Sequence, residues 1–161
     1  MQLLPTFVQT QFTVDMPATL RQFLTKKDYH RIPLTFTKTN HFEVKATINA
    51  IEGNFILDTG ASNSCVDFEA IDKFELFAQD SDVKAAGAGA TDMITQVSKK
   101  NTIGMLSWFR KNIPLVLFDL THVNTALLTH DAAPVDGIIG ADILKKGKAI
   151  IDYDRKCLYL K

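Results

Sequence analysis

Three neighbouring residues of the sequence could together support acid–base chemistry. Asp58, Thr59 and Gly60 follow directly on the apolar segment 55–57. A carboxylate at the end of a buried strand costs free energy unless it is paired or holds a proton, and carboxylates placed in this way are often there for catalysis. The alternative is a structural turn, in which the Asp58 side chain caps its own backbone and Gly60 supplies the turn conformation. The tripeptide alone favours the turn.

The context of the tripeptide in the sequence is more specific than the tripeptide alone. Much later in the chain, segment 138–140 repeats the step of two apolar residues followed by a glycine, just before an expected helix. Between the two steps, the segment 83–97 has strand-forming arms around small residues, which is typical of a hairpin. We place the tip of this hairpin at Ala88, Gly89 and Ala90.

Period-two patterns predict that most of the chain from residue 31 onward is β-structure. Phe42, Val44, Ala46 and Ile48 alternate with polar residues, as in a half-buried antiparallel strand. We expect three strands within 31–57, with a turn at 52–54. Further strands are expected within 101–120, where Pro114 marks an edge or a strand start. A closing hairpin is expected to pair 148–153 with 156–161, with its turn at 154–156.

Short helices are expected at a few places between the strands. One lies within 67–74, a second within 121–128 where Thr121 caps it, and a third follows Gly140 and stops at Gly147. Their small number leaves a mostly β domain over residues 31–161, closed or sandwich-like.

The first thirty residues differ from the rest in composition. Pro17 can open a helix there, and Leu20, Phe23 and Leu24 share one face of it. We therefore expect residues 1–30 to form a helical N-terminal extension to the β domain.

Composition excludes several classes of function. The chain has 161 residues, 46% of them hydrophobic, and a formal net charge of zero, which argues against nucleic-acid binding because that needs a basic face. No apolar run approaches the ~20 residues that cross a membrane, so no membrane span is expected. The N-terminus lacks the basic region of a signal peptide. This slightly favours the cytoplasm, and a removed signal would leave the periplasm or secretion open.

The metal-binding residue types are sparse. Cys65 and Cys157 are too few for a disulfide scaffold and are most simply buried side chains. The four histidines lack the spacing of metal ligands, so we expect neither a metal site nor a cofactor.

Four segments resemble the pepsin and retropepsin class of aspartic proteases, and above all the single-domain retropepsin-like aspartyl proteases of bacteria. They are "FILDTGAS", "AAGAGA" at the position of the family's flap, "DGIIGADIL" and "AIIDYDRKCLYL". The resemblance covers about residues 31–161. It implies a closed acid-protease β-barrel with one or two short helices, to which residues 1–30 are an addition.

The resemblance also implies a mechanism. Aspartic proteases use two adjacent carboxylates that share one proton, so that one is a base and the other an acid. This chain has one such motif, since Asp136 and Asp142 are not followed by Thr-Gly or Ser-Gly. The second acid must come from a second copy, and a twofold homodimer would place Asp58 opposite itself.

The family assigns roles to the neighbouring residues. The hydroxyl that matches Thr59 bonds across the dimer axis, and the carbonyl that matches Gly60 faces the substrate. Ala61 and the hairpin tip, Ala88, Gly89 and Ala90, would contact a peptide.

Some family features are missing from this sequence. Viral members commonly pair an acid at the position of Ser62 with an arginine at that of Ala141, and both partners are absent here. Because both charged partners are absent, neither charge is left unpaired. Their absence places the chain nearer the cellular members. The expected hairpin also has no tyrosine of the pepsin kind.

Two other functions remain open at this point. A fold does not guarantee its chemistry, so the chain could be an inactive peptide-binding module of the same fold. A β-barrel scaffold with no cleft function is the third reading.

Overall fold

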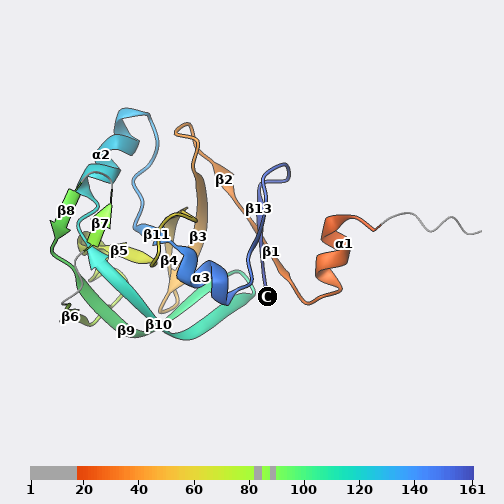
Figure 1. Ribbon diagram of the computed structural model, residues 1–161, viewed down its shortest axis with the longest axis horizontal. Helices are drawn as coiled ribbons and strands as arrows, with labels where there is room; N and C mark the ends of the chain where they lie inside the picture. The colour runs from red at the N-terminus through yellow and green to blue at the C-terminus, as the bar shows by residue number, and fades with distance from the viewer. Residues whose placement is uncertain (1–17, 82–84, 88–89) are drawn as a thin grey trace, which may run out of the picture.

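The computed structural model describes residues 18–81, 85–87 and 90–161 (Figure 1). The helical elements are α1 (Leu20–Thr25), the 3₁₀ turn η1 (Phe68–Ala70), α2 (Thr121–Thr129) and α3 (Ala141–Lys146). The strands are β1 (His30–Pro33), β2 (Thr35–Phe36), β3 (Phe42–Ile48), β4 (Ile51–Leu57), β5 (Cys65–Asp67), β6 (Ala78–Asp80), β7 (Ala85–Gly87), β8 (Ala90–Met93), β9 (Gln96–Met105), β10 (Trp108–Phe118), β11 (Gly137–Ile139), β12 (Ile150–Asp152) and β13 (Cys157–Leu160).

The main sheet closes on itself. Its strand order is β2-β3-β4-β11-β5-β10-β9-β6, and β3 also pairs with β9 through Thr47 opposite Gly104 and Ile48 opposite Ile103. This extra pairing joins β3, β4, β11, β5, β10 and β9 into a barrel. The expectation of a mostly β, closed barrel with few short helices is confirmed.

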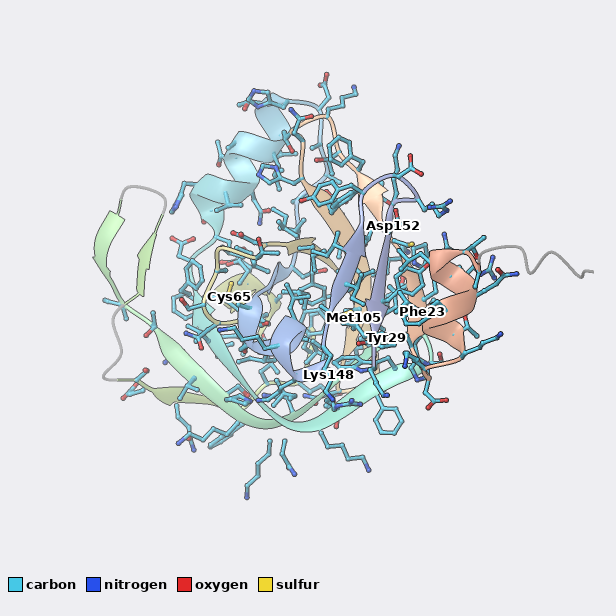
Figure 2. All side chains as sticks on the ribbon, turned by 45° about the vertical axis from the view of Figure 1, so that its right-hand side comes forward. Phe23, Tyr29, Cys65, Met105, Lys148 and Asp152 are labelled. Carbon is cyan, nitrogen blue, oxygen red and sulfur yellow. The ribbon has the colours of Figure 1, made fainter. Side chains whose placement is uncertain are left out.

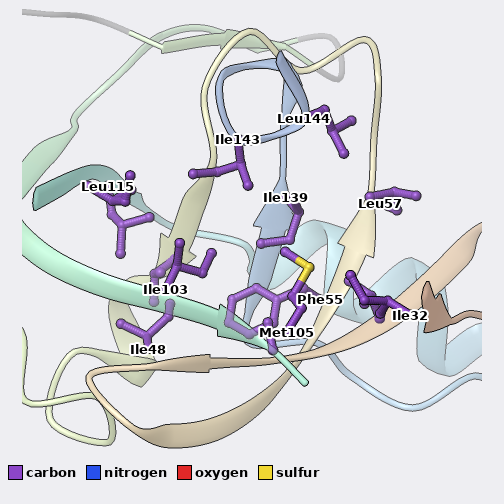
Figure 3. Packing of buried hydrophobic residues seen from close by; sticks show 14 of the residues in the cluster. Ile32, Ile48, Phe55, Leu57, Ile103, Met105, Leu115, Ile139, Ile143 and Leu144 are labelled. Carbon is purple, nitrogen blue, oxygen red and sulfur yellow. The ribbon is translucent and has the colours of Figure 1, made fainter. Parts of the chain in front are cut away.

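The barrel interior is a single large apolar core. Alternate residues of β3 (Phe42, Val44, Ala46 and Ile48) are all buried, as the period-two pattern predicts. Phe55 and Leu57 of β4 and Ile139 of β11 face the same core (Figure 3). Side chains alternate between the faces of a strand, so the residues between them point to the outside of the barrel.

The turn between β3 and β4 lies earlier than expected. Asn49 and Ala50 form it, both with positive φ (51° and 70°), as two-residue hairpin turns require. The predicted turn at 52–54 is wrong, because these residues lie within β4. Gly53 is a packing glycine: a Cβ there would come within 2.5 Å of Cζ of Phe74.

Two further expectations about local structure are corrected. Pro114 lies in the middle of β10, so the predicted strand start is wrong. Strand β10 pairs with β5 only at residues 116–118 and is therefore an edge at Pro114, where the register with β9 is irregular between Ile113 and Leu115. Such an irregularity tolerates proline, because it needs no N–H in the ladder there. Thr121 does not cap α2. It is the first residue of the helix, and Oδ1 of Asp119 accepts its backbone N–H at 2.8 Å.

The other short elements match the expectation. The segment 67–74 contains η1, α3 begins after Gly140 and ends at Gly147, and the closing hairpin pairs β12 with β13. Strand β13 also pairs with β1, so both of its edges are occupied within its own chain.

Helix α1 packs on the outside of the three-stranded sheet β1-β13-β12. Thr19 and Gln22 form a capping box at its start. Of the expected apolar face only Leu24 is buried, against Cys157 and Tyr159, whereas Leu20 and Phe23 are 42% and 50% exposed. The helix gives these three residues the shared face that their spacing predicts, and a short helix on a narrow sheet buries only one of them. Pro17 and the rest of residues 1–17 lie outside the described residues.

Candidate active site

Strand β11 lies between the two strands that flank the Asp58 loop. It runs parallel to β4 and antiparallel to β5, so the loop 58–64 passes across its C-terminal end. Three hydrogen bonds fix the loop there. The Asp58 N–H donates to the Ile139 carbonyl (3.0 Å), the Ala141 N–H to the Ala61 carbonyl (2.8 Å), and the Gly140 N–H to Oγ of Ser64 (2.8 Å).

Asp58 itself points to solvent. It follows the buried Leu57 and is exposed, as are Thr59 and Gly60. Its Oδ1 accepts the Gly60 N–H at 2.8 Å, so the side chain caps its own turn while its other oxygen stays open. The expectation of a buried carboxylate is wrong for the single chain. A Cβ on Gly60 would lie 3.2 Å from this Oδ1, tighter than an ordinary contact.

A second carboxylate supports the loop from below. Oδ1 of Asp142 accepts three hydrogen bonds: from the Ser64 N–H (2.8 Å), the Ser64 hydroxyl (2.7 Å) and its own helix at the Ile143 N–H (2.8 Å). Asp142 lies in the first turn of α3, where the helix dipole favours a negative charge. Neither Ser64 nor Asp142 was predicted to support the loop. The available signal was an acid in the first turn after the second glycine step.

The glycine of that second step is required by close packing. A Cβ on Gly140 would lie 2.7 Å from the Asn63 carbonyl oxygen and 2.8 Å from that of Ala61. Real Cβ atoms do not approach backbone so closely. The Asp58 loop can therefore rest on β11 and α3 only because residue 140 has no side chain.

Neither other acid near the second glycine step can complete a dyad within the chain. Asp136 precedes β11 at the level of Asn54, so it lies at the opposite end of the parallel strands from Asp58. It accepts the Asn54 N–H (2.8 Å) and pairs with Lys73 (2.7 Å). One oxygen of Asp142 already holds three donors.

The thiol of Cys65 lies close to several carboxylates. Burial is the main cause that raises the pKa of this thiol to about 12; a backbone hydrogen bond with Ile138 lowers it, and the negative charges of Asp142, Asp67 and Asp58 contribute to the rise. Cys65, which is labelled in Figure 2, is the first residue of β5. It lies opposite Ile138 of β11.

The expected hairpin exists but is shorter than predicted. Strands β7 and β8 pair antiparallel, Ala85 with Met93 and Gly87 with Ala90. The predicted range 83–97 is too long, because residues 96 and 97 belong to β9. Ala90 begins β8, whereas Ala88 and Gly89 lie outside the described residues.

The cysteines, the metal-binding residue types and the apolar helices were also considered in the described residues. Both cysteines are buried and free, as predicted. The described residues contain no cluster of histidine, cysteine or acidic side chains that could hold a metal ion. Within the same residues, no helix has the length and apolar character that a membrane crossing demands.

Comparison with known proteins identifies the class. Residues 44–143 match the family model of the aspartyl proteases. The match covers more than half of the chain and includes the Asp58 loop, β11 and the start of α3. The chain belongs to the aspartyl protease family. No curated protein matches it by sequence.

Solved structures agree with this family. A retropepsin-like aspartic protease from Rickettsia conorii superposes with a TM-score of 0.56 and 18% identity, covering 82% of this chain and 90% of the other. The EIAV protease complexed with the inhibitor HBY-793 gives 0.54 and 21%, over 73% and 98%. The retroviral protease-like domain of Ddi1 from Leishmania major gives 0.51 and 19%, over 74% and 86%. At these identities the likeness concerns the fold.

Proposed function

We propose that the protein is an aspartic endopeptidase that acts as a homodimer, with Asp58 of two chains as its catalytic dyad. The observation that carries the proposal is the state of Asp58. It is exposed, one of its oxygens accepts no hydrogen bond from the described residues, and its loop is fixed by hydrogen bonds to β11, Gly140 and α3. A rigidly held, exposed carboxylate suits a site that a second copy completes.

The proposed reaction is hydrolysis of a peptide bond. One Asp58 carboxylate accepts a proton from a water molecule, whose oxygen attacks the scissile carbonyl carbon. The other Asp58 is protonated and donates to the developing oxyanion. The carbon–nitrogen bond then breaks, and a proton goes to the leaving amine. The two carboxylates titrate as a pair, because like charges so close together do not both ionise.

The neighbouring residues have supporting roles in this proposal. Thr59 stabilises the dyad across the axis, Gly60 brings backbone close to the substrate, and Ala61 contacts the peptide. Ala88, Gly89 and Ala90 are proposed to close over an extended substrate. Such a substrate would be held by main-chain hydrogen bonds, as in strand addition.

A second candidate is a peptide-binding module without catalysis. Strand β13 pairs with β1 on one edge and with β12 on the other, within its own chain. A second chain therefore cannot pair a strand with β13 unless one of these two pairings breaks. A dimer that forms elsewhere could leave the two Asp58 carboxylates too far apart to share a proton.

The substitution Asp58→Asn tests the proposal. Asparagine keeps an oxygen that can accept the Gly60 N–H but cannot form the shared-proton dyad, so cleavage of an unstructured protein should disappear with little loss of stability. The matched control is Asp154→Asn, an acid in the β12–β13 turn whose side chain is 88% exposed.

Binding separates the two candidates. The wild type and both variants are titrated with a peptide inhibitor of the statine type and assayed at several pH values. Cleavage that survives Asp58→Asn would refute the assigned role. An inhibitor that binds a wild type with no cleavage at any pH would favour the binding module.

A further inference from the structure

The turn between β9 and β10 carries two large apolar side chains that the fold does not use. Leu106 and Ser107 form the turn, and Leu106 and Phe109 are 74% and 58% exposed. Leu106 has a φ of 53°, a conformation that is uncommon and costly for a leucine. Neither side chain belongs to an apolar cluster of the described residues. Packing within the chain therefore does not account for this turn, and an outlier of this kind points to a partner outside the chain.

Hydrogen bonds give the turn a fixed position beside the end of α3. Nδ1 of His30 and Oγ of Ser107 lie 2.7 Å apart, which ties the turn to β1. Trp108 is 1% exposed, and its Nε1 donates to the Lys161 carbonyl (3.1 Å). The Lys161 N–H donates to the carbonyl of Gly147, where α3 ends (2.7 Å). Figure 1 shows the same arrangement, with the C-terminus beside the end of α3 and the start of β10.

Cations lie on both sides of this contact. They are Arg110, Lys111, Lys145, Lys146, Lys148 and Lys161. None of them forms an ion pair with an acidic side chain of the described residues, and the stretches 93–118 and 143–151 contain no acid. The formal net charge of zero thus hides a local excess of positive charge. We call these six cations, together with Leu106 and Phe109, the tip surface.

The fold explains only a part of the tip surface. Lys145 and Lys146 lie in the last turn of α3, where cations offset the helix dipole. The same reason does not apply to Lys111 of β10 or to the exposed Leu106 and Phe109. A nucleic acid would match the cations and could stack on a phenylalanine, but it offers nothing to a leucine at the tip of a turn. An anionic bilayer matches both features, because its headgroups attract lysine and arginine and its acyl boundary accepts apolar side chains.

We propose that the tip surface docks the protein on an anionic lipid bilayer. Leu106 and Phe109 enter the boundary between headgroups and acyl chains, and the six cations contact the headgroups. The association is peripheral and needs no helix that crosses the membrane. It is independent of the proposed function, because the Asp58 loop rests on the start of α3 and the tip surface lies at its end.

Flotation of the full chain with lipid vesicles tests the proposal. Vesicles of phosphatidylcholine alone are compared with vesicles that contain about a third phosphatidylserine. The wild type should float with the anionic vesicles and not with the neutral ones. Binding should weaken as the salt concentration rises, because salt screens the attraction between exposed charges and headgroups.

Two substitutions at the turn test the apolar contribution. Leu106→Asn keeps a residue that tolerates positive φ, and Phe109→Thr keeps a residue that suits a strand. Each should lower the partition coefficient on anionic vesicles by about tenfold. The matched control is Phe77→Thr, since Phe77 is 74% exposed just before β6 and its loss should leave binding unchanged. Urea unfolding checks that each variant is folded.

Two double substitutions test the charge contribution. Lys111→Gln with Lys148→Asn removes two cations of the tip surface, and asparagine tolerates the φ of 48° at residue 148. Binding should weaken by about thirtyfold. The matched control is Lys38→Gln with Lys45→Gln, which changes the net charge equally but removes cations that are already paired with an acid. This control should weaken binding much less.

Several results would overturn the proposal. The first is a wild type that binds no vesicles, or binds neutral and anionic ones equally. The second is an equal loss of binding in Phe77→Thr and Phe109→Thr, or in the two double variants. Binding to polyuridylate in place of vesicles would assign the tip surface to nucleic acid. Sedimentation that shows weaker self-association of Phe109→Thr, with unchanged vesicle binding, would assign it to a second copy of the chain.

Discussion

The hydroxyl of Ser64 donates a hydrogen bond to Oδ1 of Asp142 at 2.7 Å and accepts the Gly140 N–H at 2.8 Å. Ser64 is 1% exposed, so water cannot replace either bond. The end of the Asp58 loop, the glycine step and the first turn of α3 are thus joined through one side chain. Asp142 belongs to the support of the candidate active site rather than to its chemistry.

Ser64→Ala should therefore destabilise the fold and impair the site together. It leaves the buried Gly140 N–H without its acceptor and removes one donor from a carboxylate, which costs about 2 to 3 kcal/mol. Urea unfolding measures the loss. The matched control is Ser62→Ala in the same loop, where the side chain is exposed and the change should stay within about 0.5 kcal/mol. Equal stabilities for the two variants would contradict the role of Ser64.

Peptidase activity should depend on protein concentration, because each proposed site needs two chains. Dilution dissociates the dimer and destroys sites, so specific activity should fall as the concentration passes below the dimer dissociation constant. Sedimentation gives that constant independently of the assay. Constant specific activity well below it would show that one chain carries a complete site.

The buried thiol of Cys65 should make the protein sensitive to alkali. Its pKa is about 12 in the folded chain, raised mainly by burial from the 9.0 of an exposed thiol. Between these values the unfolded chain releases the proton while the folded chain keeps it. The unfolded state then binds fewer protons, and stability falls by up to about 1.4 kcal/mol per pH unit above about pH 9.

Cys65→Ala should remove this part of the pH dependence. The measurement is the free energy of unfolding of both proteins from pH 8 to pH 11, with the difference taken at each pH. The variant loses packing and should be less stable at pH 8, and the gap should narrow as pH rises. Curves that stay parallel over the whole range would be inconsistent with a thiol that remains protonated in the folded chain.

The β7–β8 hairpin should become ordered when a peptide ligand binds. Among the described residues its two strands pair only with each other, and an isolated two-stranded hairpin is marginally stable. Amides of Ala85–Gly87 and Ala90–Met93 should exchange slowly with solvent once a statine-type inhibitor is bound. The internal control is α1 (Leu20–Thr25), at the other end of the molecule (Figure 1). Unchanged exchange in the hairpin alongside saturating binding would place the cleft elsewhere.

Several parts of the fold follow from short-range patterns of residues. Alternation in β3, the Asp58 motif after β4, the glycine step before α3 and the closing hairpin are all visible within a few residues, since strand faces, turns and helix starts are set by local sterics. These local patterns predict the Asp58 motif and the second glycine step. The closed barrel that contains them was predicted from the family resemblance.

Tertiary structure decided the relationships that no local pattern encodes. Ser64 meets Asp142 across 78 residues of sequence, and Asn124 meets Asp67 across 57; each residue alone looks like an ordinary polar surface residue. Gly53 looked like a turn because its Phe74 neighbour is distant in sequence. Asp58 looked buried because it ends a buried strand, and only the folded loop turns it to solvent. Partners in a closed barrel are chosen by strand register, and register depends on the whole sheet rather than on any one segment.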